Sequence, residues 1–172
     1  CLGVMSALWQ LRSDWGRSTV LISRDSIPDH LNFLPGMDRV QVCEKWDCEG
    51  MDVVLLECGT PARCGIGLVN PGCFVNIDHH PDNEQYGDVR LLNSEASSIG
   101  EMITLLLDKW EEMKWSVGIA DALYTAIHTD TGGFSYNNTS VNALEAAVVL
   151  ARNGAQIGSV CTKIYQEQAL KR

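Results

Sequence analysis

Two short, mostly apolar runs in the first half of the chain predict strands. Residues 52–56 and 74–77 consist mostly of valine, leucine, isoleucine and phenylalanine, which is typical of strands buried on both faces of a parallel sheet. Shorter runs at residues 18–22 and 39–42 predict two further strands, the second at a sheet edge. Before all of these, apolar residues recur at helical spacing over residues 2–11 and predict a helix.

After residue 94 the apolar period becomes helical. The segment from Ser94 to Ser98 offers several N-cap residues, and the next apolar positions recur at i, i+3, i+4, i+7 and i+8. Strands first and helices afterwards predict an α/β fold, in which a parallel β-sheet carries helices on both faces. The four helices predicted in this half cover residues 99–107, 115–128, 140–150 (after a cap at Thr139 or Ser140) and 155–170.

Metal-binding and proton-carrying side chains come directly after three of these apolar segments. Glu57 comes after the first buried run, Asp78-His79-His80 ends the second, and Asp130 stands in a glycine-broken loop after a helix. Ligands of parallel sheets gather at the carboxyl ends of the strands, so we expect these groups to converge. Imidazole and carboxylate together suit a divalent cation such as manganese, magnesium, zinc or iron.

Such a set could build a two-metal phosphoester site. The metals would activate a water and neutralise the phosphate, and a second histidine would bind a phosphoryl oxygen or protonate the leaving group. Each group also has an ordinary structural explanation. Glu57 could be a solvated strand end, Asp130 could hold an Asx turn, and the two adjacent histidines could lie in a surface turn.

Length and charge narrow the class of protein. At 172 residues the chain has the size of one domain, and no apolar run approaches the roughly 18 residues of a membrane span. The net charge is −9 without any lysine- or arginine-rich block, which disfavours binding of long duplex DNA. A short anionic substrate remains compatible with this charge, because bound metals would supply the positive charge.

The seven cysteines are odd in number, and no two have the C-x2-C spacing of a zinc ribbon. A zinc cluster built from Cys43, Cys48, Cys58 and Cys64 is the alternative. Reduced, mostly buried thiols in a cytoplasmic protein are the favoured interpretation.

Several ordered motifs together resemble the DHH phosphoesterase family. Asn76 to His80 matches its signature, Ala96 to Glu101 its next helix cap, and Ala122 to Phe134 its fourth motif. Residues 27–28 and 33–36 resemble the linking segment of one branch. That branch contains oligoribonucleases and phosphoadenosine-phosphate phosphatases and is related to exopolyphosphatases.

The resemblance implies a role for each candidate residue. His79 and Asp130 would be metal ligands, and Glu57 stands where the family has an aspartate that bridges two metals. His80 would contact the scissile phosphate, and Asp78 would orient a histidine. The implied cofactor is a pair of Mn²⁺ ions, with Mg²⁺ as the alternative.

The chain departs from the family in three places. Glu57 is one methylene longer than the expected aspartate. The family's first motif, a histidine followed by Asp-Gly-Asp, would precede residue 1, because Cys1 to Met5 resembles the residues directly after that motif. The C-terminal DHH-associated domain that holds substrate would lie downstream. We therefore expect a single DHH catalytic domain over residues 1–172, weakly active or inactive without those segments.

The implied reaction is hydrolysis of a phosphoester in a small nucleotide: a short oligoribonucleotide, a dinucleotide or 3′-phosphoadenosine phosphate. An inorganic pyrophosphatase or exopolyphosphatase of the same family is one alternative, and a catalytically degenerate nucleotide-binding domain is another. The expected partner is a small nucleotide or short oligonucleotide, with no long duplex and no membrane. The sequence does not decide whether the chain forms a homodimer.

Overall fold

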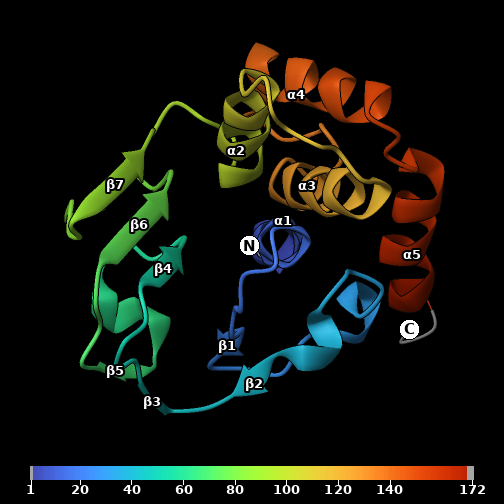
Figure 1. Cartoon of the computed structure of the whole chain (residues 1–172). Helices are drawn as coiled ribbons and strands as arrows, with labels where there is room; N and C mark the ends of the chain where they lie inside the picture. Colours follow the sequence, from blue (N-terminus) through green and yellow to red (C-terminus); the bar gives the residue numbers. More distant parts are fainter. Residues whose placement is uncertain (1, 170–172) are drawn as a thin grey trace. The chain divides into compact units, whose positions relative to one another are not determined.

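The computed structural model describes residues 2–169 and divides into two compact units (Figure 1). One unit contains the long helices and is called the helical unit below; the other contains the strands and is called the strand unit. The helical unit comprises Cys1–Leu21, Ile27–Val40 and Ala96–Arg172, and the strand unit comprises Ile22–Ser26 and Gln41–Glu95. The predicted α/β class with parallel strands is confirmed.

The helical unit is built around its third helix. Helix α3 contacts α1, α2, α4 and α5, and Ile119, Leu123 and Ile127 on it are fully buried. Gly3 lets α1 approach α3 closely, since a side chain at residue 3 would collide with the backbone of Ala122 on α3. The helices are α1 (Leu2–Asp14), α2 (Ile99–Asp108), α3 (Val117–Asp130), α4 (Val141–Arg152) and α5 (Ile157–Ala169), with short 3-10 turns η1 (Asp29–Leu31) and η2 (Met37–Arg39).

Serine side chains begin three of these helices. Ser98, Ser116 and Ser140 each accept a hydrogen bond from the backbone N–H three residues later, which satisfies a donor that the first turn leaves open. The predicted helices are confirmed, and the cap of α4 is Ser140 rather than Thr139. Residue 170 of the last predicted helix, and Cys1 of the motif-like N-terminal segment, lie outside the described residues.

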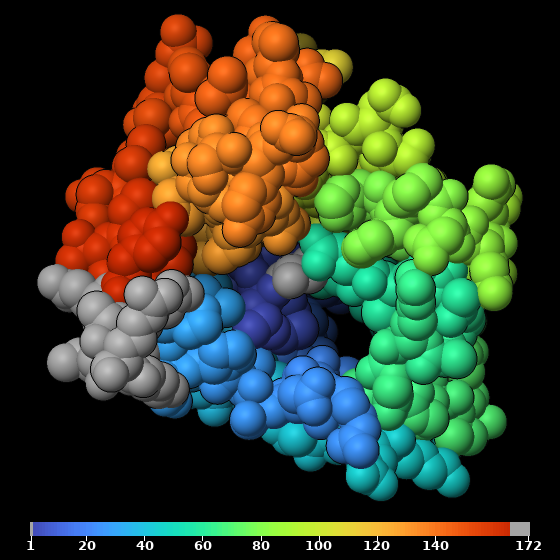
Figure 2. Space-filling view, turned by 180° about the vertical axis from the view of Figure 1, so that it is seen from behind, coloured from blue at the N-terminus to red at the C-terminus, as the bar shows by residue number. Residues whose placement is uncertain are grey.

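The outer face of α4 carries exposed apolar side chains. Val141, Leu144 and Val148 are each about half exposed or more and lie on one side of the helix. Figure 2 shows α4, in orange, on the surface of the helical unit. Within residues 2–169, none of the helices combines the length and the apolar character that crossing a membrane requires.

The strand unit contains three parallel sheets. Its main sheet has the order β4-β6-β7, and Leu56 of β4 lies opposite Ile77 of β6. Two smaller parallel pairs, β1-β2 and β3-β5, and the 3-10 turn η3 complete it. The strands are β1 (Ile22–Ser23), β2 (Gln41–Val42), β3 (Lys45–Asp47), β4 (Val53–Leu56), β5 (Gly67–Val69), β6 (Phe74–Asp78) and β7 (Val89–Leu92), and η3 spans Pro61–Cys64.

The sequence prediction differs from the strand unit in several details. The prediction that the β4 run is buried on both faces was wrong, because Val54 is 46% exposed while Leu55, on the opposite face, is buried. Of the strand predicted over 18–22, only its last residue is in β1, and the edge strand predicted over 39–42 is reduced to β2. Strands β3, β5 and β7 were not predicted, since each is too short or too polar to form a clear run.

Candidate metal and phosphoester site

The ends of β4 and β6 bring Glu57 beside the Asp78-His79-His80 tripeptide. The two strands are parallel neighbours, and the backbone N–H of Glu57 donates to the carbonyl of Ile77 at 2.9 Å. The predicted convergence of these segments at one sheet edge is therefore seen within the strand unit. Glu57 has a φ of 56°, a left-handed conformation. This conformation is energetically unfavourable for any residue other than glycine.

Glu57 and His79 form a donor pair of the kind that binds divalent metals. A carboxylate oxygen of Glu57 and a ring nitrogen of His79 lie within 4.8 Å of each other. An ion bound at about 2.1 Å to each of two donors keeps them no more than about 4.2 Å apart, so at most a small side-chain rotation is needed. A carboxylate oxygen and an imidazole nitrogen together suit a hard or borderline divalent cation better than a soft metal.

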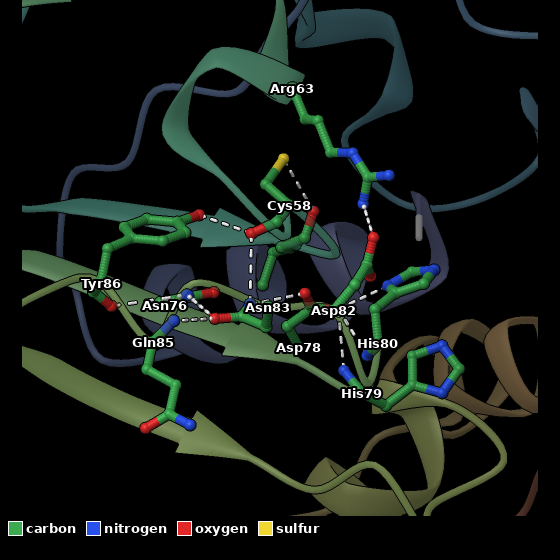
Figure 3. A network of polar contacts seen from close by, with 11 residues as sticks. Cys58, Arg63, Asn76, Asp78, His79, His80, Asp82, Asn83, Gln85 and Tyr86 are labelled. Atoms are coloured by element: carbon green, nitrogen blue, oxygen red, sulfur yellow. Dashed lines mark hydrogen bonds and ion pairs between the residues drawn. The ribbon is translucent and has the colours of Figure 1, made fainter.

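Asp78 is a buried hydrogen-bond acceptor and not a free ligand. It is 1% exposed. Its Oδ1 accepts from the backbone N–H of His79 at 2.8 Å and of His80 at 3.2 Å, and lies 2.7 Å from Nδ1 of His80 (Figure 3). Its Oδ2 accepts from Asn83 Nδ2 at 2.6 Å. Burial by itself raises the pKa of Asp78, but the hydrogen bonds from Asn83, His80 and the two backbone amides outweigh it and leave the pKa below its usual value.

An ionised Asp78 fixes the orientation of the His80 ring. Because the carboxylate can only accept, Nδ1 of His80 carries the hydrogen in this contact, and Nε2 is left to meet another group. The His80 side chain is 43% exposed, so that second nitrogen is accessible to a ligand. A buried carboxylate bonded to a ring nitrogen in this way holds the histidine ring in one orientation.

Three further side chains complete this network, and the sequence pattern assigned none of them a role. Asn83 bonds to Asp78, Tyr86 bonds to the loop after Glu57, and Asn76 bonds to Asn83 (Figure 3). The hydroxyl of Tyr86 donates to the carbonyl of Cys58 at 2.7 Å. An asparagine two residues after Pro81 is typical of an ordinary turn. The sequence pattern therefore does not predict these contacts, and the structure shows them.

Asp130 belongs to the helical unit, where it is the last residue of α3 and not, as predicted, a loop residue. Its carbonyl accepts from Asn138 Nδ2 at 3.1 Å. After Thr131, Gly132 and Gly133 have φ of 57° and 67°, left-handed values that turn the chain sharply away from the helix. Glycine at these positions explains how α3 ends directly after Asp130.

The described cysteines are free thiols, namely Cys43, Cys48, Cys58, Cys64, Cys73 and Cys161. Of these only Cys48 is buried and the others are partly exposed, so the prediction of mostly buried thiols was too strong. Burial, followed by the neighbouring Cys64, raises the pKa of Cys58 to about 11. The Cys58 thiol is therefore neutral at physiological pH.

The chain is similar to several curated proteins. A Streptococcus mutans protein named probable bifunctional oligoribonuclease and PAP phosphatase NrnA is 33% identical to it over 131 residues. This matched region covers 76% of this chain and 41% of the relative. The chain is 28% identical over 137 residues to the Thermus thermophilus bifunctional oligoribonuclease and PAP phosphatase NrnA, covering 80% of this chain and 42% of that protein. The Bacillus subtilis protein of that name is 29% identical over 139 residues, covering 79% and 44%. No family model matches the chain.

Solved structures share the fold. An exopolyphosphatase-related protein from Bacteroides fragilis superposes with a TM-score of 0.80 at 20% identity, over 96% of this chain and 52% of that one. A putative family II inorganic pyrophosphatase from Methanococcus jannaschii gives a TM-score of 0.64 at 16% identity, over 89% and 53%. The chain thus spans less than half the length of the curated relatives and about half that of the solved structures.

Proposed function

Because the chain belongs to the DHH phosphoesterase family, we propose that it is the DHH part of a metal-dependent enzyme that hydrolyses phosphoesters of small nucleotides. The names of the curated relatives support short oligoribonucleotides and PAP as the substrates. The net charge of −9 supports a small substrate over a long strand, since few cations are present to track a phosphate backbone.

The observation that carries the proposal is the pairing of Glu57 and His79 as donors at adjacent strand ends, beside a histidine oriented by a buried carboxylate. We propose that Asp130 joins Glu57 and His79 as a ligand. Bound divalent ions would supply positive charge and a water of lowered pKa. Mn²⁺ is the proposed metal and Mg²⁺ the alternative.

Within this proposal His80 contacts the substrate. Asp78 holds its Nδ1–H, so Nε2 is directed to a phosphoryl oxygen or to the leaving oxygen, where it can donate a proton. Asp78 contributes by fixing the orientation of the ring. Glu57 would hold the metal from a backbone in a left-handed conformation, which fixes the direction in which its side chain leaves the chain.

The test uses the protein prepared from its complete gene, with a two-nucleotide RNA as substrate and Mn²⁺ or Mg²⁺ present. We expect hydrolysis, and we expect His80→Ala to reduce it by at least about 100-fold, because a positioned proton donor contributes about 10²–10⁴-fold. The matched control is Glu84→Ala, since Glu84 is an exposed residue of the same loop. Absence of hydrolysis with both metals would contradict the proposal.

A second candidate, a pyrophosphatase, is favoured by the fold shared with the Methanococcus jannaschii protein. Faster release of phosphate from pyrophosphate than of nucleotide from the RNA would support it. A catalytically degenerate nucleotide-binding domain, suggested by Glu57 in place of aspartate, would be stabilised by nucleotide against heat without turning it over.

A further inference from the structure

One side chain, Asn83, connects the two loops that carry the proposed metal ligands. Its Nδ2 donates to Asp78 Oδ2 at 2.6 Å and to the carbonyl of Cys58 at 3.4 Å (Figure 3). Asp78 directly precedes His79, and Cys58 directly follows Glu57. The two hydrogens of one amide group are therefore shared between the loop after β4 and the end of β6.

The Asn83 side chain is itself held in one orientation. Its Oδ1 accepts from Asn76 Nδ2 at 3.2 Å and from the backbone N–H of Gln85 at 2.7 Å. Both donors and both acceptor positions of the amide are thus occupied. Turning the amide by 180° would point its oxygen at the Asp78 carboxylate and the Cys58 carbonyl, which would repel it, so only one orientation is compatible with these neighbours.

The backbone that Asn83 contacts is under strain. Glu57 adopts its left-handed φ immediately before Cys58, and such a conformation persists only where the surroundings enforce it. Two hydrogen bonds to the Cys58 carbonyl, from Tyr86 at 2.7 Å and from Asn83 at 3.4 Å, supply that restraint together with the Glu57 N–H bond to Ile77.

From these contacts we propose that Asn83 is a positioning residue that sets the separation between Glu57 and His79 and so prepares the strand unit to bind a divalent metal. This inference rests on the proposed function. Asn83 touches neither metal nor substrate; it acts through Asp78 on one side and through the Cys58 carbonyl on the other. Tyr86 supports only the Cys58 side, and its loss should therefore matter less.

The test measures Mn²⁺ binding by titration calorimetry in the protein from the complete gene. We expect Asn83→Ala to weaken binding by about 10- to 100-fold, the usual effect of removing a group that orients a ligand. Asn83→Asp should weaken it further, because it places a second carboxylate against Asp78. Tyr86→Phe, which keeps the ring beside Phe74, should have a smaller effect.

Controls separate positioning from loss of folding. Asn142→Ala removes an exposed asparagine of α4 and should leave Mn²⁺ affinity unchanged. Thermal unfolding without metal should show that Asn83→Ala remains folded; if it does not, Tyr86→Phe carries the test alone. In kinetics, the weakened metal affinity should raise the Mn²⁺ concentration for half-maximal rate more than it lowers kcat at saturating Mn²⁺.

The outcomes distinguish this inference from the proposed function. If Glu57→Gln loses Mn²⁺ binding while folded Asn83→Ala and Tyr86→Phe bind like the unaltered protein, the positioning role is overturned and the metal site stands. If the unaltered protein neither binds Mn²⁺ nor hydrolyses the RNA, the proposed function fails and the inference fails with it.

Discussion

The helical unit and the strand unit are stabilised in different ways. The helical unit packs fully buried apolar side chains around α3, and serine caps begin its helices. The strand unit has short strands with several half-exposed apolar residues, and its interior contains a polar network around the buried Asp78. The comparison teaches that apolar burial is distributed unequally, because hydrogen-bonded polar groups in the strand unit occupy interior positions that apolar side chains fill in the helical unit.

The largest expected effect is on the free energy of unfolding, and it differs between the two units. Leu123→Ala removes a fully buried side chain from α3 and should lower the free energy of unfolding by about 2–5 kcal/mol. Val54→Ala in β4 truncates a side chain that is 46% exposed and should cost less than about 1 kcal/mol. Urea unfolding of both variants measures the difference, and similar losses would mean that the strand unit depends on apolar burial as much as the helical unit does.

A buried carboxylate in the helical unit provides the next test. Glu101 is 2% exposed, and its Oε2 accepts from the N–H and hydroxyl of Ser97 and from the hydroxyl of Ser140 at 2.8 Å. Glu101→Ala leaves these donors unsatisfied and should destabilise the protein by about 1–3 kcal/mol. The exposed Glu145→Ala is the control, and a thermal shift no larger than that of the control would refute the structural role.

A smaller effect is expected from helix capping. Ser116 Oγ accepts from Ile119 N at the start of α3, so Ser116→Ala should cost about 1 kcal/mol. In the strand unit Thr60 caps only the short turn η3, accepting from Arg63 N at 3.3 Å, and Thr60→Ala should cost less. Chemical unfolding of both variants tests whether the free energy of unfolding lost with a cap increases with the length of the helix that the cap begins.

The sequence predicted the helical unit better than the strand unit for a physical reason. Helix period and serine caps are local signals, so α2 to α4 could be located from neighbouring residues alone. Strands β3 and β5 have three residues each, and their pairing depends on contacts across the chain. An uninterrupted apolar run also cannot tell an exposed face from a buried one, as Val54 demonstrates.

Within the candidate site, the sequence indicated the groups that are proposed to carry the chemistry, but not the side chains that contact them. The Asp78-His79-His80 tripeptide and Glu57 stood out because each comes at the end of an apolar strand. Asn83 bonds to Cys58, which is 25 residues away, and no local pattern indicates such a contact. The joint action of Asp130 with the strand-unit residues stays a prediction.

The smallest effect is expected at Tyr124. It appears only at alkaline pH. Burial, followed by the hydrogen bond with Cys161, raises the pKa of this tyrosine on α3 above its usual value. Because the folded pKa is the higher one, the stabilising contribution is complete below the unfolded pKa of about 10 and is lost as the pH rises through the folded value. Tyr124→Phe should therefore reduce the fall in the unfolding midpoint between pH 9 and pH 11, whereas Tyr136→Phe, at an exposed position, should not. Identical alkaline profiles for the two variants would show that ionisation of Tyr124 does not limit the stability of the helical unit.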